Sequence, residues 1–177
     1  MPESYKHLTK KEERHIKKYV VIIGIIFVWV IGTLFHFAYE WSGENPVVGL
    51  ISPVNESVWE HMKLIFFPMV IFGLLKKDKE TNTCQTSAYY AGMLTGTFLI
   101  PVVFYIYTAI LGKSSLIFDI LLFYVSVFIA FAISLYFSKN CLLQKYNKWL
   151  FAAVLLLMAL FFVFTYAPPS LPIFMTS

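Results

Sequence analysis

Charged side chains are scarce in this sequence. Only 14% of its 177 residues are Asp, Glu, Lys or Arg, against about a quarter in a soluble domain. Hydrophobic residues make up 59% of the chain, which leaves no room for a separate soluble domain beside the apolar segments. The scarcity of charge therefore excludes a soluble globular protein and predicts an integral membrane protein.

Cysteine is nearly absent as well. The chain has two, Cys84 and Cys141, which form no C-x-x-C motif and have no histidine nearby. Both fall on the side of the membrane that the charge pattern below predicts to be cytoplasmic, where thiols stay reduced. We therefore expect neither a disulfide nor a zinc knuckle.

Five long apolar segments fill most of the chain. A helix that crosses a bilayer needs about 20 apolar residues. The predicted spans are approximately residues 19–41, 53–75, 88–111, 116–137 and 149–166. They predict an all-α, polytopic membrane protein in which residues 19–167 form a single transmembrane domain of five helices, followed by a short outer tail at 168–177.

Local signals refine two of these spans. Ser52 and Pro53 suit the N-cap and the first position of the second helix. Gly92 and Gly96 form a G-x-x-x-G pattern in the third span, which permits close helix packing, although glycine is common in membrane helices for other reasons.

Basic residues gather on one side of the predicted spans. Of the 14 lysines and arginines, all but Lys63 and Lys113 precede the first span or lie in the loops between the second and third and the fourth and fifth. The positive-inside rule places these segments, including a basic arm at residues 1–18, in the cytoplasm and the C-terminus outside. This pattern explains the net charge of +4 without a nucleic-acid partner, and it predicts a multi-pass protein of the cell membrane.

Ionisable residues concentrate at the predicted outer ends of the first two spans. His36 and Glu40 lie four residues apart near the end of the first span, so they share one face of a helix. Such groups are costly to keep charged near hydrocarbon, and their concentration here calls for either partners or a function.

The second span opens with a matching group. Glu56, Glu60 and Lys63 have the spacing of one helical stripe, and His61 points about 100° round the helix from Glu60. Antiparallel neighbours joined by a short loop bring such faces together at one depth. We expect a polar pocket that opens to the outside of the cell.

The residue types in this predicted pocket suit a divalent metal, zinc above others. Zinc binds imidazole and carboxylate groups and can keep one position open for an activated water. The expected ligands are His36, Glu40, Glu60 and His61, and of these His36, Glu40 and Glu60 are also the expected catalytic residues. The substrate would be a lipidic or amphipathic molecule from the bilayer. The residues expected to bind or orient it are Trp41, Asn55, Glu56, Trp59 and Lys63.

Three other interpretations remain open. His36 and Glu40 can act as an acid/base pair without a metal. The same groups can bind or relay an ion in a small transporter or binding protein without catalysis. Finally, the glutamates can be helix-end charges that pair with Lys63 and favour the helix dipole. A transporter needs a polar path to the inner face, and the third to fifth spans offer few polar residues there.

Three stretches of sequence resemble a known family. LFHFAYEWSG, PVNESVWEHMKLIFFP and FTYAPPSLPIF are similar to segments of small bacterial multi-pass membrane proteins, the domain-of-unknown-function family 6512. The resemblance covers nearly the whole chain. It implies a bundle with about this number of spans in the cell membrane, and it implies no established activity.

A fainter similarity links the chain to the sterol-isomerase and sigma-two-receptor superfamily. Members of that superfamily carry a His-x-x-x-Glu pair in a membrane helix, followed by a tryptophan and acidic residues in a loop. In this sequence His36 and Glu40 would form the pair. Trp59 and Glu60 would take the other two parts, although here the pair lies in the first span. The similarity is an analogy of site rather than of fold.

Overall fold

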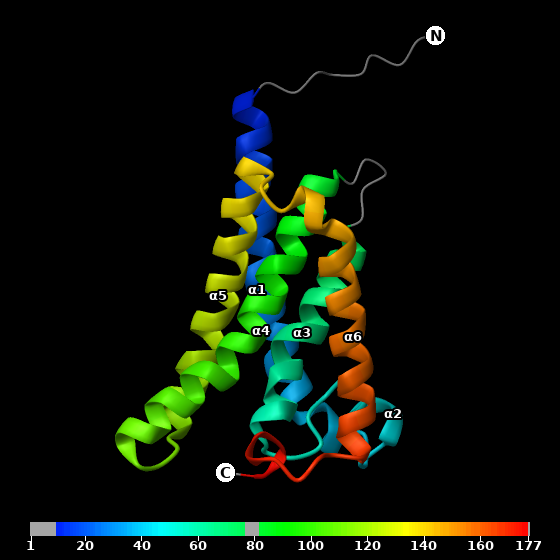
Figure 1. The fold of residues 1–177 in the computed structure, drawn as a ribbon, viewed down its shortest axis with the longest axis vertical. Helices are drawn as coiled ribbons and strands as arrows, with labels where there is room; N and C mark the ends of the chain where they lie inside the picture. The colour runs from blue at the N-terminus through cyan, green and yellow to red at the C-terminus, as the bar shows by residue number, and fades with distance from the viewer. Residues whose placement is uncertain (1–9, 77–81, 177) are drawn as a thin grey trace.

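Five long helices stand side by side in the computed structural model (Figure 1), which describes residues 10–76 and 82–176, with side chains from Lys18 onward. Residues 1–9 of the predicted basic arm and residues 77–81 of the first predicted inner loop lie outside the described residues. The long helices are α1 (Lys10–Trp41), α3 (Val58–Leu75), α4 (Thr83–Leu111), α5 (Leu116–Asn140) and α6 (Asn147–Tyr166). Three short helices, α2 (Pro46–Gly49), η1 (Gln144–Tyr146) and η2 (Pro172–Phe174), lie in the connections and the tail.

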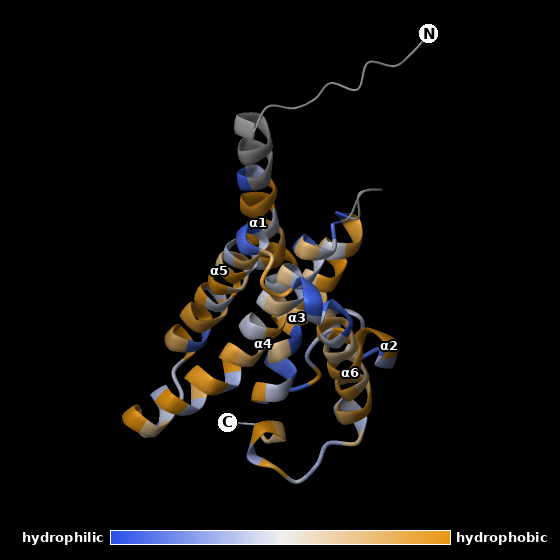
Figure 2. Ribbon diagram, turned by 45° about the horizontal axis from the view of Figure 1, so that its top comes forward, coloured by the Kyte–Doolittle hydropathy of each residue, from blue (hydrophilic) through white to orange (hydrophobic). Residues whose placement is uncertain are grey.

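All five long helices are long and apolar enough to cross a membrane. The candidate spans are Lys18–Trp41, Val58–Leu75, Thr83–Leu111, Leu116–Asn140 and Gln144–Tyr166. Hydrophobic residues run along each of these helices (Figure 2), and many of the largest are exposed on the outer surface of the bundle. The prediction of an all-α, five-span membrane protein is therefore confirmed. The side of the membrane that each end faces stays a prediction.

The helix α3 lies at the centre of the bundle. In the most apolar stretch of α3, 67% of the residues are buried inside the bundle. The corresponding share in the other four spans is 17% to 28%. It packs against α1, α4 and α6, and Met62, Phe66 and Met69 on it are fully buried. Its neighbours thus shield α3 from lipid, and this helix can carry polar groups that would be costly on an outer helix.

The start of α3 differs from the prediction. The N-cap is Ser57, whose hydroxyl accepts a hydrogen bond from the Glu60 amide at 3.4 Å. Ser52 instead donates to the carbonyl of Val48 at the end of α2. Because the helix begins at Val58 rather than near Pro53, Glu56 precedes it and shares no helical stripe with Glu60.

The close packing expected at Gly92 and Gly96 is present between α4 and α5. A Cβ atom added at Gly92 would lie 2.2 Å from the Ala130 carbonyl oxygen, and one at Gly96 would lie 2.6 Å from the Ala130 Cβ. No larger side chain fits at either position without a shift of the helices. The glycine pattern thus lets α4 and α5 form a closely packed antiparallel pair.

A disulfide joins Cys84 to Cys141, so the expectation of two free thiols is wrong. Cys84 lies in the first turn of α4, and Cys141 follows the last residue of α5. The two residues are almost equally distant from Gly112, before and after it, where the chain reverses. An antiparallel helix pair brings such residues to the same height, and the Cα atoms lie 5.0 Å apart.

Candidate functional site

Two imidazoles and one carboxylate meet where α1 ends and α3 begins. His36 comes from α1, Glu56 from the loop before α3, and His61 from the first turns of α3. The Glu56 carboxylate lies 3.9 Å from His36 Nε2 through one oxygen and 3.3 Å from His61 Nε2 through the other. One ligand atom from each residue lies within 4.8 Å of the other two. We call these three residues the His/Glu cluster.

The loop between α1 and α3 brings these side chains together. Gly43 and Glu44 both adopt positive φ angles, which reverse the chain directly after α1. Asn45 then caps α2 by accepting from the Val47 amide at 2.9 Å. Asn55 accepts from the Ser57 amide at 2.9 Å, and this turn sets the position of the residue between them. Asn55, which we expected to orient the site, is thus part of the turn that places Glu56.

The cluster lies at the surface of the bundle. The Glu56 side chain is 69% exposed, whereas those of His36 and His61 are 30% and 28% exposed. The hydrogen bond with His61 is the largest cause that lowers the pKa of Glu56 below its ordinary value. Burial opposes this shift, and the charges of both histidines add to it. Glu56 is therefore a carboxylate at neutral pH.

The hydrogen bonding of His61 fixes its tautomer. Its Nδ1 lies 2.9 Å from the backbone carbonyl oxygen of Ser57, and a carbonyl can only accept, so the proton is on Nδ1. In a neutral ring, Nε2 then carries a lone pair that faces the Glu56 carboxylate at 3.3 Å. Two acceptors at this distance repel unless a positive charge lies between them. The cluster thus requires either a proton on Nε2 or a bound cation.

His36 has an incomplete set of partners. Its Nε2 is on the side of Glu56, and its Nδ1 is buried without a hydrogen-bond partner in the described part of the chain. The two imidazole rings lie beside each other, with their centroids 5.3 Å apart. A second ring nitrogen, from α1, is therefore available on the same side of the carboxylate.

Glu40, predicted as a ligand, is not part of this cluster. It is exposed in the last turn of α1, while His36 one turn earlier faces α3. Trp41, predicted to contact substrate, is exposed beside it and stacks on Phe37, with ring centroids 5.6 Å apart. Phe37 in turn meets the His36 ring edge-on, with the ring centroids 4.9 Å apart, so the two aromatic rings extend from the His/Glu cluster to the end of α1.

Glu60, the other predicted carboxylate ligand, faces away from the cluster into the bundle. It forms a buried ion pair with Lys63, whose Nζ lies 2.7 Å from the Glu60 carboxylate. Both side chains are almost completely buried, and the Val54 amide also donates to Glu60 at 3.0 Å. Glu56 thus occupies the place that we expected for Glu60, because α3 begins after Glu56 rather than before it.

The buried pair is fully hydrogen bonded. The Lys63 ammonium donates to Glu60, to the Thr165 hydroxyl at 2.6 Å and to the Gly49 carbonyl at 2.9 Å. Thr165 lies in the last turns of α6, and nothing in the sequence pointed to it. Gly49 has no room for a side chain, because a Cβ would lie 2.7 Å from the Tyr166 hydroxyl. The pair therefore ties α3, α6 and the loop after α2 together.

Trp59, predicted to bind substrate, lies in the core instead. Its ring contacts those of Phe161, Phe164 and Phe174, with centroid distances of 4.8, 5.7 and 4.9 Å. Phe174 belongs to η2, so the C-terminal tail covers Trp59 and packs on α3. A β-bridge between Ser57 and Thr176 holds the tail against the N-cap of α3.

Comparison with known proteins identifies a family. The model of a family described as a family of unknown function (DUF6512) matches residues 8–177 of the chain. This match confirms the resemblance seen in the sequence. No curated protein and no solved structure matches the chain.

Proposed function

We propose that this chain, which belongs to the family of unknown function DUF6512, binds a divalent metal ion through His36, Glu56 and His61. The supporting observation is the close approach of acceptor atoms: His61 Nε2 lies 3.3 Å from the Glu56 carboxylate while Nδ1 holds the ring proton. A metal ion between the three side chains would remove the repulsion between these acceptors.

The distances suit zinc. Nitrogen and oxygen ligands lie about 2.0–2.2 Å from zinc in a tetrahedral site, which puts two ligand atoms about 3.4 Å apart. The two distances from Glu56 to the imidazole nitrogens, 3.3 and 3.9 Å, lie close to this value. The contact of His61 Nδ1 with the Ser57 carbonyl is also the support that metal-bound histidines usually have.

Three protein ligands leave a fourth position for water or substrate, as in catalytic zinc sites. Zinc in such a site lowers the pKa of a bound water and polarises a carbonyl or phosphoryl group. Glu56 is the most exposed of the three ligands, so the open position is on the outer side of the cluster, away from the core. A molecule can therefore approach from the membrane surface without entering the bundle.

The surroundings favour an amphipathic substrate. The exposed rings of Phe37 and Trp41 lie beside the cluster, at the end of a span where aromatic side chains meet lipid headgroups. A molecule with an apolar part in the bilayer would place its polar part at the cluster. We therefore propose metal-assisted hydrolysis of a lipidic or amphipathic molecule at the outer face of the cell membrane.

Metal analysis of the purified full chain tests the metal site. We expect about one zinc ion per chain after dialysis, and affinity lowered by more than about a hundredfold in His36→Ala, Glu56→Gln and His61→Ala. Glu40→Gln is the matched control, because it removes an acidic group one turn from His36 that is not in the cluster. Negligible zinc in the wild type, or equal loss in Glu40→Gln, would contradict the proposal.

The 3.3 Å contact between His61 and Glu56 also favours a second candidate, an acid/base pair in which a proton takes the place of the metal. In that case His61 is an imidazolium and the site moves a proton to or from an amphipathic substrate. An NMR titration of the purified chain with zinc and with acid separates the two candidates. NMR signals of the two imidazoles shift on addition of zinc if the ligands bind metal, and respond only to pH if they do not.

A further inference from the structure

The disulfide between Cys84 and Cys141 lies at the end of the bundle where α1 begins, opposite the His/Glu cluster. Lysines flank it in sequence at positions 139, 145 and 148. The positive-inside rule predicts this end to be cytoplasmic, and thiols in that compartment stay reduced unless they take part in redox chemistry. A disulfide at a predicted reducing face is typical of a bond that opens and closes.

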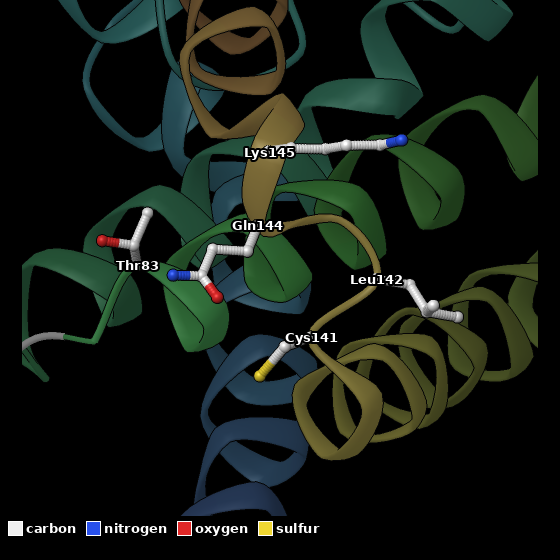
Figure 3. Close-up of a pocket in the computed structure, with 5 residues that line it drawn as sticks. All are labelled: Thr83, Cys141, Leu142, Gln144 and Lys145. Carbon is white, nitrogen blue, oxygen red and sulfur yellow. The ribbon is translucent and has the colours of Figure 1, made fainter.

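The two halves of this disulfide differ in accessibility. Cys84 is 2% exposed and lies in the first turn of α4, whereas Cys141 is exposed after the end of α5. A hollow of about 550 Å³ adjoins Cys141 (Figure 3), and its other lining residues are Thr83, Leu142, Gln144 and Lys145. A small molecule can reach the disulfide from this hollow. Of the two cysteines, Cys141 is the one that is exposed there.

We propose that Cys84–Cys141 is an exchangeable disulfide and that a small anionic thiol reacts with it from this hollow. The thiolate attacks Sγ of Cys141, a new S–S bond forms there, and the bond between the two cysteines breaks. Cys84 leaves as a thiolate and takes a proton from solvent. A second thiol then attacks the mixed disulfide and leaves a Cys141 thiol, so that two thiols become one small disulfide while the protein gains two electrons and two protons.

The surroundings favour this direction of attack. Lys145 lines the hollow, and its side chain extends away from Cys141 (Figure 3) to place the ammonium 4.8 Å from the centroid of the Tyr146 ring. With the lysines at positions 139 and 148, it gives this end of the bundle a positive charge that attracts an anionic thiol. Cys84 departs in the first turn of α4, where the helix dipole favours a negative charge. A leaving thiol that is stabilised as a thiolate leaves faster.

Reaction of the purified full chain with two thiol probes tests the proposal. The probes are 3-mercaptopropionate, which is anionic, and cysteamine, which is cationic. Each rate is divided by the rate of the same thiol with a small, freely soluble disulfide. We expect the mixed disulfide on Cys141 by mass mapping and a normalised rate about threefold or more higher for the anionic thiol. An adduct on Cys84, or no reaction under native conditions, would overturn the proposal.

Two variants separate attraction by Lys145 from simple accessibility. Lys145→Glu should remove the preference for the anionic probe while the disulfide still forms. Cys84→Ser, treated with the disulfide form of 3-mercaptopropionate, should hold a lasting adduct on Cys141, because the exchange releases one 3-mercaptopropionate and the Cys84 thiol that would displace the other is gone. An unchanged preference in Lys145→Glu would refute the role of the charge in the hollow.

Trapping in intact cells tests the bond in its own compartment. Rapid alkylation with a membrane-permeant maleimide should find part of the protein reduced at both cysteines, and that part should grow when cells receive a reductant. Complete oxidation under all conditions would show a structural disulfide and overturn the proposal. The result is independent of zinc, which binds at the other end of the bundle in the function proposed above.

Discussion

The His/Glu cluster and the Glu60–Lys63 pair include residues only a few positions apart in sequence, yet the cluster lies at the surface of the bundle and the pair is buried inside it. Glu60 and Lys63 are buried inside the bundle, and every hydrogen-bonding direction of the ammonium is used. Glu56 is largely exposed, and a ring nitrogen of each neighbouring imidazole faces its carboxylate.

This difference separates a structural role from a chemical one. Charges that are taken fully out of water persist only when they are paired and hydrogen bonded, and removal of one partner is then costly. A carboxylate and two imidazoles at the surface gain little from their own contacts and retain the capacity to bind a cation. We therefore expect the two groups to respond in opposite ways to substitution and to metal.

The largest effect is expected for Glu60→Ala. This change leaves the Lys63 ammonium buried without its counter-ion, and the free energy of unfolding should fall by about 3–5 kcal/mol. Circular dichroism during titration with a denaturing detergent measures the change. The double variant Glu60→Gln with Lys63→Met removes both charges and should recover most of the loss. Equal destabilisation in the double variant would show that packing, rather than the unpaired charge, controls stability here.

A smaller effect is expected from zinc. A ligand that binds only the folded state at about 100 times its Kd adds about 2.7 kcal/mol to the free energy of unfolding. The wild type should show this gain and Glu56→Gln should not. Magnesium is the control ion, because it prefers oxygen ligands and should give no gain. Stabilisation of Glu56→Gln by zinc to the same extent would place the ion elsewhere.

The smallest effect is expected for Glu56→Gln in the absence of metal. An exposed ion pair contributes about 0–1 kcal/mol, so the free energy of unfolding should change little at neutral pH. The hydrogen bond with His61 holds the pKa of Glu56 in the folded chain below its ordinary value. The contribution of the carboxylate is therefore present above about pH 4.5 and is lost as the pH falls through the lowered pKa. Unfolding titrations at several pH values should show the difference between the two proteins vanishing in acid. A difference that widens in acid would reverse the sign of this interaction.

The sequence predicted the bundle well because long apolar segments and basic loops are strong signals. It also predicted that polar side chains of the first two spans meet. The predicted start of α3 near Pro53 is wrong, because Ser57 rather than Ser52 caps the helix. The spacing of Ser57 and Glu60 is that of a capping box, S-x-x-E, and this signal marks the observed start. Because the helix starts after Glu56, this residue rather than Glu60 faces the two histidines.

Other features had weaker signals in the sequence or none. Thr165 is one hydroxyl in an apolar helix, and only the packing of α6 on α3 brings it to Lys63. The disulfide was within reach of prediction, because Cys84 and Cys141 are nearly symmetrical about the turn at Gly112. The predicted cytoplasmic side, where thiols stay reduced, instead gave the expectation of two free thiols, which is wrong.

The contact between Lys63 and Thr165 has a consequence for biosynthesis. The two residues are 102 positions apart, so α3 leaves the ribosome well before α6 is made. During that interval the ammonium of Lys63 lacks one of its final partners while the helix is already near lipid. The early intermediate has to keep α3 sheltered, by α1 or by the insertion machinery, until the last helix arrives. Maturation of this protein should therefore end with a late docking step, and chains stopped before α6 should be substrates for membrane quality control.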